Sequence, residues 1–211
     1  MKVTVIGAGN MGSAFVKQLT LAGHQVSVTA RDPAKAGQVA SAHPNARAVD
    51  AADAARDAEV IVLATAYADA VSALRSLGDL RGKIVIDITN PLTADYMGLT
   101  IGHTTSAAEE IARAVPGVEL VKGFNTVFAQ VLGAGADLGR GQTVNVFLAS
   151  DSARAKQVVT ELARSMGFVV VDAGGLKNAR YLEPLAGLNI YLGYGAGLGT
   201  AMAPAWVHRA S

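Results

Sequence analysis

The sequence lacks cysteine altogether and is poor in aromatic and charged side chains, which make up 5% and 17% of its 211 residues. Without cysteine the chain has no disulfide, no thiolate nucleophile and no Cys-ligated zinc, and this usage is compatible with the cytoplasmic location that we expect. The formal net charge is only +1. We therefore expect neither nucleic acid nor an anionic membrane among the partners, which leaves small-molecule coenzymes or protein. The four histidines lack metal-ligand spacing, and we predict no metal site.

Charged residues are also missing from a long C-terminal stretch. No Asp, Glu, Lys or Arg occurs between Glu183 and Arg209, and a stretch of this length could span a bilayer. Pro184, Pro204 and the interspersed glycines disfavour insertion as a membrane helix. We expect instead a C-terminal helix that is too apolar for a monomer surface and packs at the twofold interface of a homodimer.

The rest of the chain alternates apolar strand-like segments with helical ones. Strands are expected at residues 3–6, 25–29, 47–49, 59–63, 83–88, 119–123, 143–149 and 168–172, and helices at 10–22, 33–42, 50–58, 68–77, 127–133 and 152–166. This order predicts an α/β fold with a Rossmann-type, doubly wound, mostly parallel sheet. We assign residues 1–173 to this domain. We expect residues 174–211 to form a helical tail that packs on the domain or at a dimer interface and is not an independent domain.

The first expected strand leads into the motif G-x-G-x-x-G, formed by Gly7, Gly9 and Gly12. The first glycine of such a loop permits a tight turn, the second lets a pyrophosphate approach the backbone, and the third lets the helix pack closely on the strand. Free N–H groups at the helix N-terminus, where Asn10 and Met11 lie, would bind the phosphates. Because the motif lies between an expected strand and an expected helix, it predicts a dinucleotide site.

The residues after the second strand discriminate between the two nicotinamide coenzymes. Asp32 lies twenty residues beyond the last glycine of the motif, near where an NAD enzyme places an acid for the ribose 2′-hydroxyl. Asp32 followed by Pro33 is also typical of a helix N-cap with proline at the first helical position. In that case Thr29, Arg31 and Lys35 would bind a 2′-phosphate. We therefore expect NADP(H) rather than NAD.

Three later strands end in small or polar residues instead of further aliphatic ones. Since ligands of open α/β sheets bind beyond the carboxyl ends of the strands, we expect these ends to form one crevice. Its nicotinamide-lining candidates are Asn90, Pro91, Asn125 and Thr126. No acid–base pair accompanies them, which suits hydride transfer between two cofactors, a reaction that depends on positioning and electrostatics. The remaining expected cofactor contacts are Thr65, Ala66, Tyr67, Val127 and Ala129.

Three further features are open to two interpretations each. The segment 92–105 could close over the crevice as a lid, whereas its His103 is favoured as a plain surface histidine. Asp87, inside an apolar strand, could be an orienting carboxylate, although a structural hydrogen bond at the strand end is favoured. Arg180 and Glu183 are three residues apart and could form an intrahelical ion pair, or Arg180 could meet an anionic part of the hydride acceptor; the ion pair is favoured.

Three stretches together resemble the NADP oxidoreductases that depend on coenzyme F420, an 8-hydroxy-5-deazaflavin. They are Asp87-Ile-Thr-Asn-Pro-Leu92, Lys122-Gly-Phe-Asn-Thr126 and the segment 172–185, and the resemblance covers nearly the whole chain. It implies NADPH on the loop 7–12, with a flavin-like ring stacked over the nicotinamide for direct hydride transfer. The loop sequence GAGNMG and Asn125 also resemble the reductase domains of membrane metalloreductases, which use NADPH and a flavin.

The expected activity is therefore that of an NADP(H)-dependent oxidoreductase that transfers a hydride between NADPH and F420. One alternative is an NADPH-dependent flavin or ferric reductase, with a flavin in place of the deazaflavin. A second alternative is a non-catalytic NADP(H)-binding sensor, which would bind NADPH tightly but oxidise it with no acceptor.

Overall fold

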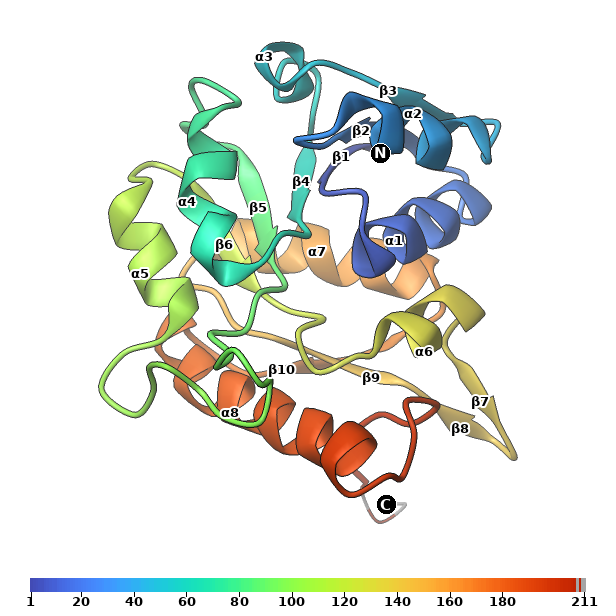
Figure 1. Ribbon diagram of the computed structural model, residues 1–211, viewed down its shortest axis with the longest axis vertical. Coiled ribbons are helices and arrows are strands. Elements are labelled where there is room, and N and C mark those ends of the chain that lie inside the picture. The colour runs from blue at the N-terminus through green and yellow to red at the C-terminus, as the bar shows by residue number, and fades with distance from the viewer. Residues whose placement is uncertain (208, 210–211) are drawn as a thin grey trace.

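A parallel sheet forms the centre of the computed structural model, which describes residues 1–207 and 209 (Figure 1). Six strands lie in the order β3-β2-β1-β4-β5-β6, and every neighbouring pair is parallel. The order reverses between β1 and β4, which makes this point the topological switch of a doubly wound sheet. The predicted Rossmann-type α/β fold is confirmed. The strands are β1 Lys2–Ile6, β2 Gln25–Thr29, β3 Ala46–Ala48, β4 Val60–Leu63, β5 Ile84–Asp87 and β6 Glu119–Lys122.

Helices cover both faces of the sheet because successive strand residues point to opposite sides. Val60 and Val62 of β4 belong to one hydrophobic core with α1 and α7, whereas Ile61 and Leu63 belong to a second core with α4 and α5. All four side chains are fully buried, which explains the unbroken apolar run of this strand. The helices are α1 Asn10–Leu21, α2 Pro33–Ser41, α3 Ala51–Ala54, α4 Tyr67–Arg75, α5 Ala107–Ala114, α6 Ala129–Ala134, α7 Ala153–Ser165 and α8 Ala179–Ile190.

A second pair of strands joins the sheet at β6. Lys122, the last residue of β6, exchanges antiparallel backbone hydrogen bonds of 2.9 and 3.0 Å with Ala149. Residue 149 directly follows β9 (Asn145–Leu148), which pairs in parallel with β10 (Val169–Asp172). The stretch before β9, expected as a loop, contains a short hairpin of β7 (Asp137–Gly139) and β8 (Gln142–Thr143).

Helix α5 is absent from the elements expected from the sequence. Its N-cap is Ser106, whose hydroxyl accepts a hydrogen bond from the backbone N–H of Glu109 at 3.1 Å and donates one to the Glu109 carboxylate at 2.8 Å. Ser and Glu three residues apart are a form of the capping-box signature of a helix start. This signal is visible in the sequence and could have located the helix.

The C-terminal part contains a 3₁₀ turn, η1 (Leu176–Asn178), helix α8 and a π-helical turn, η2 (Tyr191–Gly195). Residues 196–207 after it form no helix or strand, so the expected helical tail ends at residue 195 within the part of the chain that the structure describes. Figure 1 shows α8 running along one side of the molecule next to β9 and β10. Leu182 and Ala186 face inward and are buried, whereas Tyr181, Leu188 and Tyr191 are more than half exposed. This outer face is where we predict the twofold interface. Both that interface and the division into residues 1–173 and 174–211 stay predictions.

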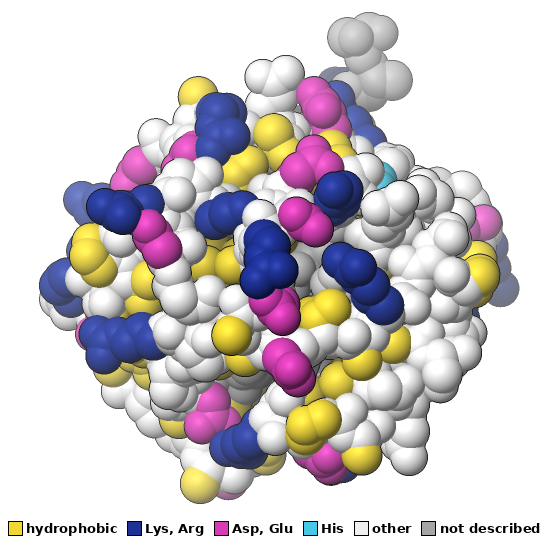
Figure 2. Space-filling model, turned by 90° about the horizontal axis from the view of Figure 1, so that it is seen from above, with side chains coloured by type: hydrophobic (Ala, Val, Ile, Leu, Met, Phe, Trp, Pro, Cys, Tyr) yellow, Lys and Arg dark blue, Asp and Glu magenta, His cyan; other side chains and the backbone are white. Residues whose placement is uncertain are grey.

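The surface carries charges of both signs. Figure 2 shows basic and acidic side chains interspersed over one face, as a net charge near zero leads one to expect. Among the helices of residues 1–207, none is long and apolar enough to cross a membrane.

Candidate cofactor crevice

The glycine loop between β1 and α1 is folded as its spacing predicts. Gly7 has a positive φ of 111°, and its N–H donates to the Thr29 carbonyl oxygen at 2.8 Å. A Cβ atom on Gly12 would lie 1.9 Å from the Gly7 carbonyl oxygen, so only glycine lets α1 start this close to the loop. A Cβ atom on Gly9 would meet nothing within 4 Å. The loop therefore leaves open space over its middle glycine, at the N-terminus of a helix.

The end of β2 supports the N-cap interpretation of Asp32. Its carboxylate accepts a hydrogen bond from the Ala34 N–H at 3.0 Å, and Pro33 is the first residue of α2. The side chain of Arg31 is 90% exposed, and its guanidinium lies 3.8 Å from the Asp69 carboxylate on α4. Lys35 on the first turn of α2 is exposed as well. Both cations are thus accessible next to the buried Thr29.

A crevice of about 640 Å³ opens at the carboxyl ends of β5 and β6. Seven of the predicted cofactor contacts line it together, which are Asn10, Met11, Asn90, Asn125, Thr126, Val127 and Ala129. The volume falls in the range usual for small-molecule sites. Its other walls come from segments far away in the sequence, namely residues 95–97 of the loop after β5 and residues 186–194 of the C-terminal part. Further lining residues are Ile88, Asp95, Tyr96, Met97, Phe128, Ala186, Asn189, Ile190 and Tyr194.

Two asparagines join the ends of β5 and β6 inside the crevice. The Asn90 amide donates to the Asn125 carbonyl oxygen at 3.0 Å, and the Asn125 amide donates to Asn90 Oδ1 at 3.0 Å and to the Leu182 carbonyl oxygen on α8 at 2.9 Å. Asn125 Oδ1 and Thr126 Oγ1 are buried without a hydrogen-bond partner in the described part of the chain. Leaving a buried polar atom unpaired costs about 1–3 kcal/mol. Both residues line the crevice, so a ligand group that reached these atoms would recover this cost.

The turn after β6 sets the orientation of Asn125 and Thr126. Phe124 has a left-handed φ of 59°, a conformation that costs a non-glycine residue about 1–3 kcal/mol. Its fully buried ring packs edge-on against Phe15 and Phe168, with centroids 5.0 and 5.7 Å away. A Cβ atom on Gly123 would lie 2.5 Å from a methyl carbon of Leu148, so the preceding residue is also confined. Packing thus holds a strained turn from which Asn125 enters the crevice.

A fully buried ion network underlies the crevice. Lys122 Nζ lies 2.9 Å from Asp87 Oδ2 on β5 and 2.9 Å from Glu183 Oε1 on α8, and it also donates to the Thr89 carbonyl oxygen. The Glu183 carboxylate in turn accepts from the N–H groups of Ala107 and Ala108, at 2.9 and 3.1 Å. These are the first N–H groups of α5, where the helix dipole favours a negative charge. The network was missed because its members are remote in sequence, and Asp87 has the structural role that we favoured.

The structure corrects the expected pairing of Arg180 with Glu183. The guanidinium of Arg180 donates to both carboxylate oxygens of Glu109 on α5, at 2.8 and 2.7 Å, while Glu183 binds Lys122. The Arg180 guanidinium holds the pKa of the Glu109 carboxyl below its usual value. Arg180 therefore fastens α8 to α5 and is not among the residues that line the crevice.

The predicted contacts at the end of β4 do not line the crevice, and neither does Pro91. The Tyr67 hydroxyl donates to the Glu110 carboxylate on α5 at 2.6 Å, and burial together with this carboxylate raises the pKa of Tyr67 to about 12. Thr65 Oγ1 donates to the carbonyl oxygen of Ala66 at 3.1 Å. Any contact of this segment with a coenzyme would lie outside the crevice.

The loop 92–105 lies partly over the crevice, through Asp95, Tyr96 and Met97. Leu92 forms an antiparallel bridge with Leu99 at the base of the loop. His103 is exposed and is not part of the lining. In the described residues no group of three His, Asp or Glu side chains is placed to hold a metal ion.

Two glycines of the C-terminal turn η2 let this turn pack closely against Phe128 and against the loop 92–105. A Cβ atom on Gly193 would lie 2.7 Å from the ring of Phe128. One on Gly195 would lie 2.8 Å from the Tyr191 ring and 3.2 Å from the sulfur of Met97. Neither Gly193 nor Gly195 has room for a side chain unless the neighbouring side chains move.

Comparison with known proteins finds a matching family model and relatives that cover most of the chain. The family model described as NADP oxidoreductase, coenzyme F420-dependent, matches residues 2–91. The F420-dependent NADP reductase of Methanothermobacter thermautotrophicus is 32% identical over 209 residues, which cover 91% of this chain and 89% of that protein. A solved structure, provisionally assigned as an F420-dependent NADP reductase of Arthrobacter sp. FB24, has a TM-score of 0.84 and 33% identity, and covers 95% of this chain and 96% of its own.

A second kind of relative is much longer. Metalloreductase STEAP3 of Rattus norvegicus is 32% identical over 185 residues, or 87% of this chain. The chain spans only 36% of the length of that protein. The similarity is therefore to one part of the metalloreductase.

We predict that Lys122→Met lowers the free energy of unfolding by about 3–5 kcal/mol, because the carboxylates of Asp87 and Glu183 stay buried without their cation. Urea unfolding at neutral pH measures this loss. Arg81→Met is the control, since Arg81 pairs with Asp79 at 2.7 Å on the surface and should show no measurable change. Asp87→Asn added to Lys122→Met should recover part of the loss. Wild-type stability of Lys122→Met would show that the network does not stabilise the fold.

Proposed function

The chain belongs to the family of coenzyme F420-dependent NADP oxidoreductases, and we propose that it transfers a hydride between NADPH and a deazaflavin coenzyme. The observation that carries this proposal is the crevice between the N-terminus of α1 and the carboxyl ends of β5 and β6, with two unpaired buried polar atoms in its lining residues and no acid–base pair among them. When bound, NADPH supplies the hydride and the deazaflavin accepts it together with a proton. The chain itself binds, orients and shields the two coenzymes.

The glycine loop fits the pyrophosphate of a dinucleotide. The space over Gly9 lies at the N-terminus of α1, where free N–H groups and the helix dipole attract phosphate. The exposed Arg31 and Lys35 are suited to a 2′-phosphate because the competing acid, Asp32, is occupied as the N-cap of α2. This arrangement supports NADP(H) over NAD.

The crevice fits a nicotinamide and leaves room for a second ring. Asn125 Oδ1 is an acceptor for a carboxamide N–H, and Thr126 Oγ1 can donate or accept. Asn90 keeps the Asn125 amide in place through their reciprocal hydrogen bonds. Residues 95–97 and α8 cover the site, which limits the access of water to a transferred hydride.

A flavin or ferric reductase is the alternative function. It is supported by the similarity to the metalloreductase, and the same crevice would then receive a flavin ring. The NADP(H)-binding half is common to both proposals, so the acceptor distinguishes them.

We predict that Gly9→Ala leaves the stability of the protein unchanged but weakens NADPH binding on the order of ten- to hundredfold, because the new methyl group occupies the space for the pyrophosphate. The φ of Gly9, −82°, is ordinary for alanine. Fluorescence titration with NADPH and thermal unfolding measure the two quantities. Gly37→Ala, in α2 and equally free of close contacts, should keep wild-type affinity. Unchanged affinity of Gly9→Ala would place the coenzyme elsewhere.

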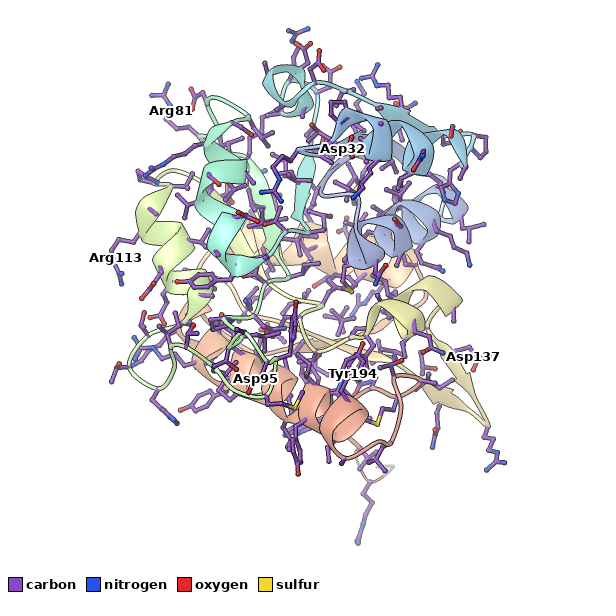
Figure 3. The ribbon with its side chains drawn as sticks, viewed as in Figure 1. Asp32, Arg81, Asp95, Arg113, Asp137 and Tyr194 are labelled. Atoms are coloured by element: carbon purple, nitrogen blue, oxygen red, sulfur yellow. The ribbon has the colours of Figure 1, made fainter. Side chains whose placement is uncertain are left out.

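Arg31→Ala should weaken NADPH binding about tenfold or more and leave NADH binding almost unchanged, since only NADPH carries the 2′-phosphate. Titration with each coenzyme measures the ratio. Arg113→Ala, an exposed arginine on α5 far from α2 (Figure 3), is the control for loss of one surface charge. An equal effect of Arg31→Ala on both coenzymes would contradict the assignment to NADP(H).

An acceptor screen tests the activity itself. NADPH oxidation is followed with F420, FMN, FAD and a ferric chelate, and we expect the highest kcat/KM with F420. Turnover with flavins or iron but not with F420 would favour the reductase alternative. Tight binding of NADPH without oxidation by any of these acceptors would favour the sensor.

A further inference from the structure

The inner face of helix α8 brings one polar side chain into the crevice, that of Asn189. Asn189 lines the crevice together with Ala186, three residues before it, and Ile190, which follows it. This spacing places all three on one face of the helix. The other two residues are apolar, and Asn189 is only 7% exposed. A carboxamide buried to this extent on an apolar face needs hydrogen-bond partners.

The backbone fixes one end of the Asn189 carboxamide. Its Nδ2 donates to the carbonyl oxygen of Thr126 at 3.0 Å. Because a carbonyl oxygen can only accept, the NH₂ group must be the end that faces Thr126, and Oδ1 must point away from it. Among the described residues none donates to Oδ1, and this oxygen is nonetheless not sealed off from solvent. Asn189 therefore holds a free acceptor at the wall of the crevice that it lines.

The neighbouring carboxamides divide their donors and acceptors in the same way. Asn125 Nδ2 donates to the Leu182 carbonyl oxygen at 2.9 Å and to Asn90 Oδ1 at 3.0 Å, so a backbone carbonyl sets its orientation too. Asn90 Nδ2 donates to the Asn125 carbonyl oxygen at 3.0 Å. Each of the three amide nitrogens thus already donates to the protein, whereas the Oδ1 atoms of Asn125 and Asn189 accept nothing from it. These two side chains offer acceptors to a ligand.

We propose that Asn189 is a specificity-determining residue whose Oδ1 accepts a hydrogen bond from an N–H group on the planar ring of a coenzyme. This inference rests on the proposed function, because it concerns the coenzymes of that same crevice. Both coenzymes carry such a group, since nicotinamide has a carboxamide NH₂ and a deazaflavin or flavin has a ring imide N–H between two carbonyl groups. A ring with a methyl group in place of this N–H leaves Oδ1 unpaired and binds more weakly.

Two pairs of ligands that differ only in this group test the proposal without turnover. NADP⁺ is compared with its acetylpyridine analogue, in which a methyl group replaces the amide NH₂. Riboflavin is compared with its derivative methylated at the imide nitrogen, both titrated into the NADP⁺-bound protein. By fluorescence titration of the wild type, the N–H member of at least one pair should bind about three- to tenfold more tightly, the factor that one hydrogen bond contributes. Equal affinities within both pairs would overturn the inference.

Substitution of Asn189 shows whether this preference comes from its oxygen. Asn189→Leu, of similar shape, should lower the preference for the N–H member by the same factor, whereas a merely structural loss of the contact with Thr126 would weaken both members of a pair equally. Asn189→Ser, smaller and still polar, should give the same result if the leucine variant does not fold.

The matched control is Asn178→Leu. Asn178 Nδ2 also donates to a backbone carbonyl oxygen of the C-terminal part, that of Ala173 at 2.6 Å, but Asn178 does not line the crevice. This variant should keep the wild-type preference. An unchanged preference in both Asn189 variants, or an equal change in Asn178→Leu, would overturn the inference.

The two pairs also identify the ligand and separate this inference from the proposed function. If residue 189 affects only the NADP⁺ pair, Oδ1 binds the nicotinamide carboxamide; if it affects only the riboflavin pair, Oδ1 binds the imide of the hydride acceptor. Either result supports the inference. If no acceptor oxidises NADPH but one preference depends on residue 189, the proposed function fails and the inference holds. If deazaflavins react but neither preference depends on residue 189, the inference fails alone.

Discussion

The ammonium group of Lys122 holds together parts of the chain that are far apart in sequence. The side chain of Lys122 reaches Asp87 on β5 and Glu183 on α8, and Glu183 in turn caps α5. The backbone of Lys122 pairs with Ala149, next to β9. A buried charge is tolerated only when it is paired and fully hydrogen-bonded. All these elements must therefore be in place together. The crevice depends on this constraint, because its two asparagines follow directly from the strand ends that Lys122 joins.

Periodicity and topology account for what the sequence could predict. Apolar runs located the strands, and parallel strands end at the same edge, so Asn90, Asn125 and Thr126 had to come close together. Contacts between remote residues could not be predicted in the same way. An ion pair three residues apart contributes only a few tenths of a kcal/mol, and Arg180 and Glu183 each have a buried or bidentate partner on another element instead. The direction of a side chain also depends on remote contacts and could not be predicted. Tyr67, for example, points to Glu110 on α5 and not into the crevice.

The two halves of the site are built on different principles. The end where we propose that the coenzyme binds is formed mainly by backbone atoms of the loop 7–12. The geometry of this loop requires glycine at Gly7 and Gly12, and such glycines can be recognised in a sequence. The end where we propose that the acceptor binds is made of side chains from the loop 92–105 and from the C-terminal part. The family model follows this division, because its match ends at Pro91, just before that loop. The relatives of similar length also cover the loop 92–105 and the C-terminal part, at 32% and 33% identity.

Gly193 and Gly195 in the C-terminal turn have a consequence for how the preference for an acceptor can change. A methyl group on Gly193 would meet the ring of Phe128, and one on Gly195 would meet Tyr191 and Met97. Phe128 and Met97 line the crevice, so both glycines let its lining side chains lie close to the C-terminal turn. Their role is not flexibility. A substitution that adds one carbon there would displace Phe128 or Met97 and so change the shape of the crevice without altering a charged group. Enzymes with the same donor site could in this way diverge in the planar molecules they admit while every polar residue stays the same.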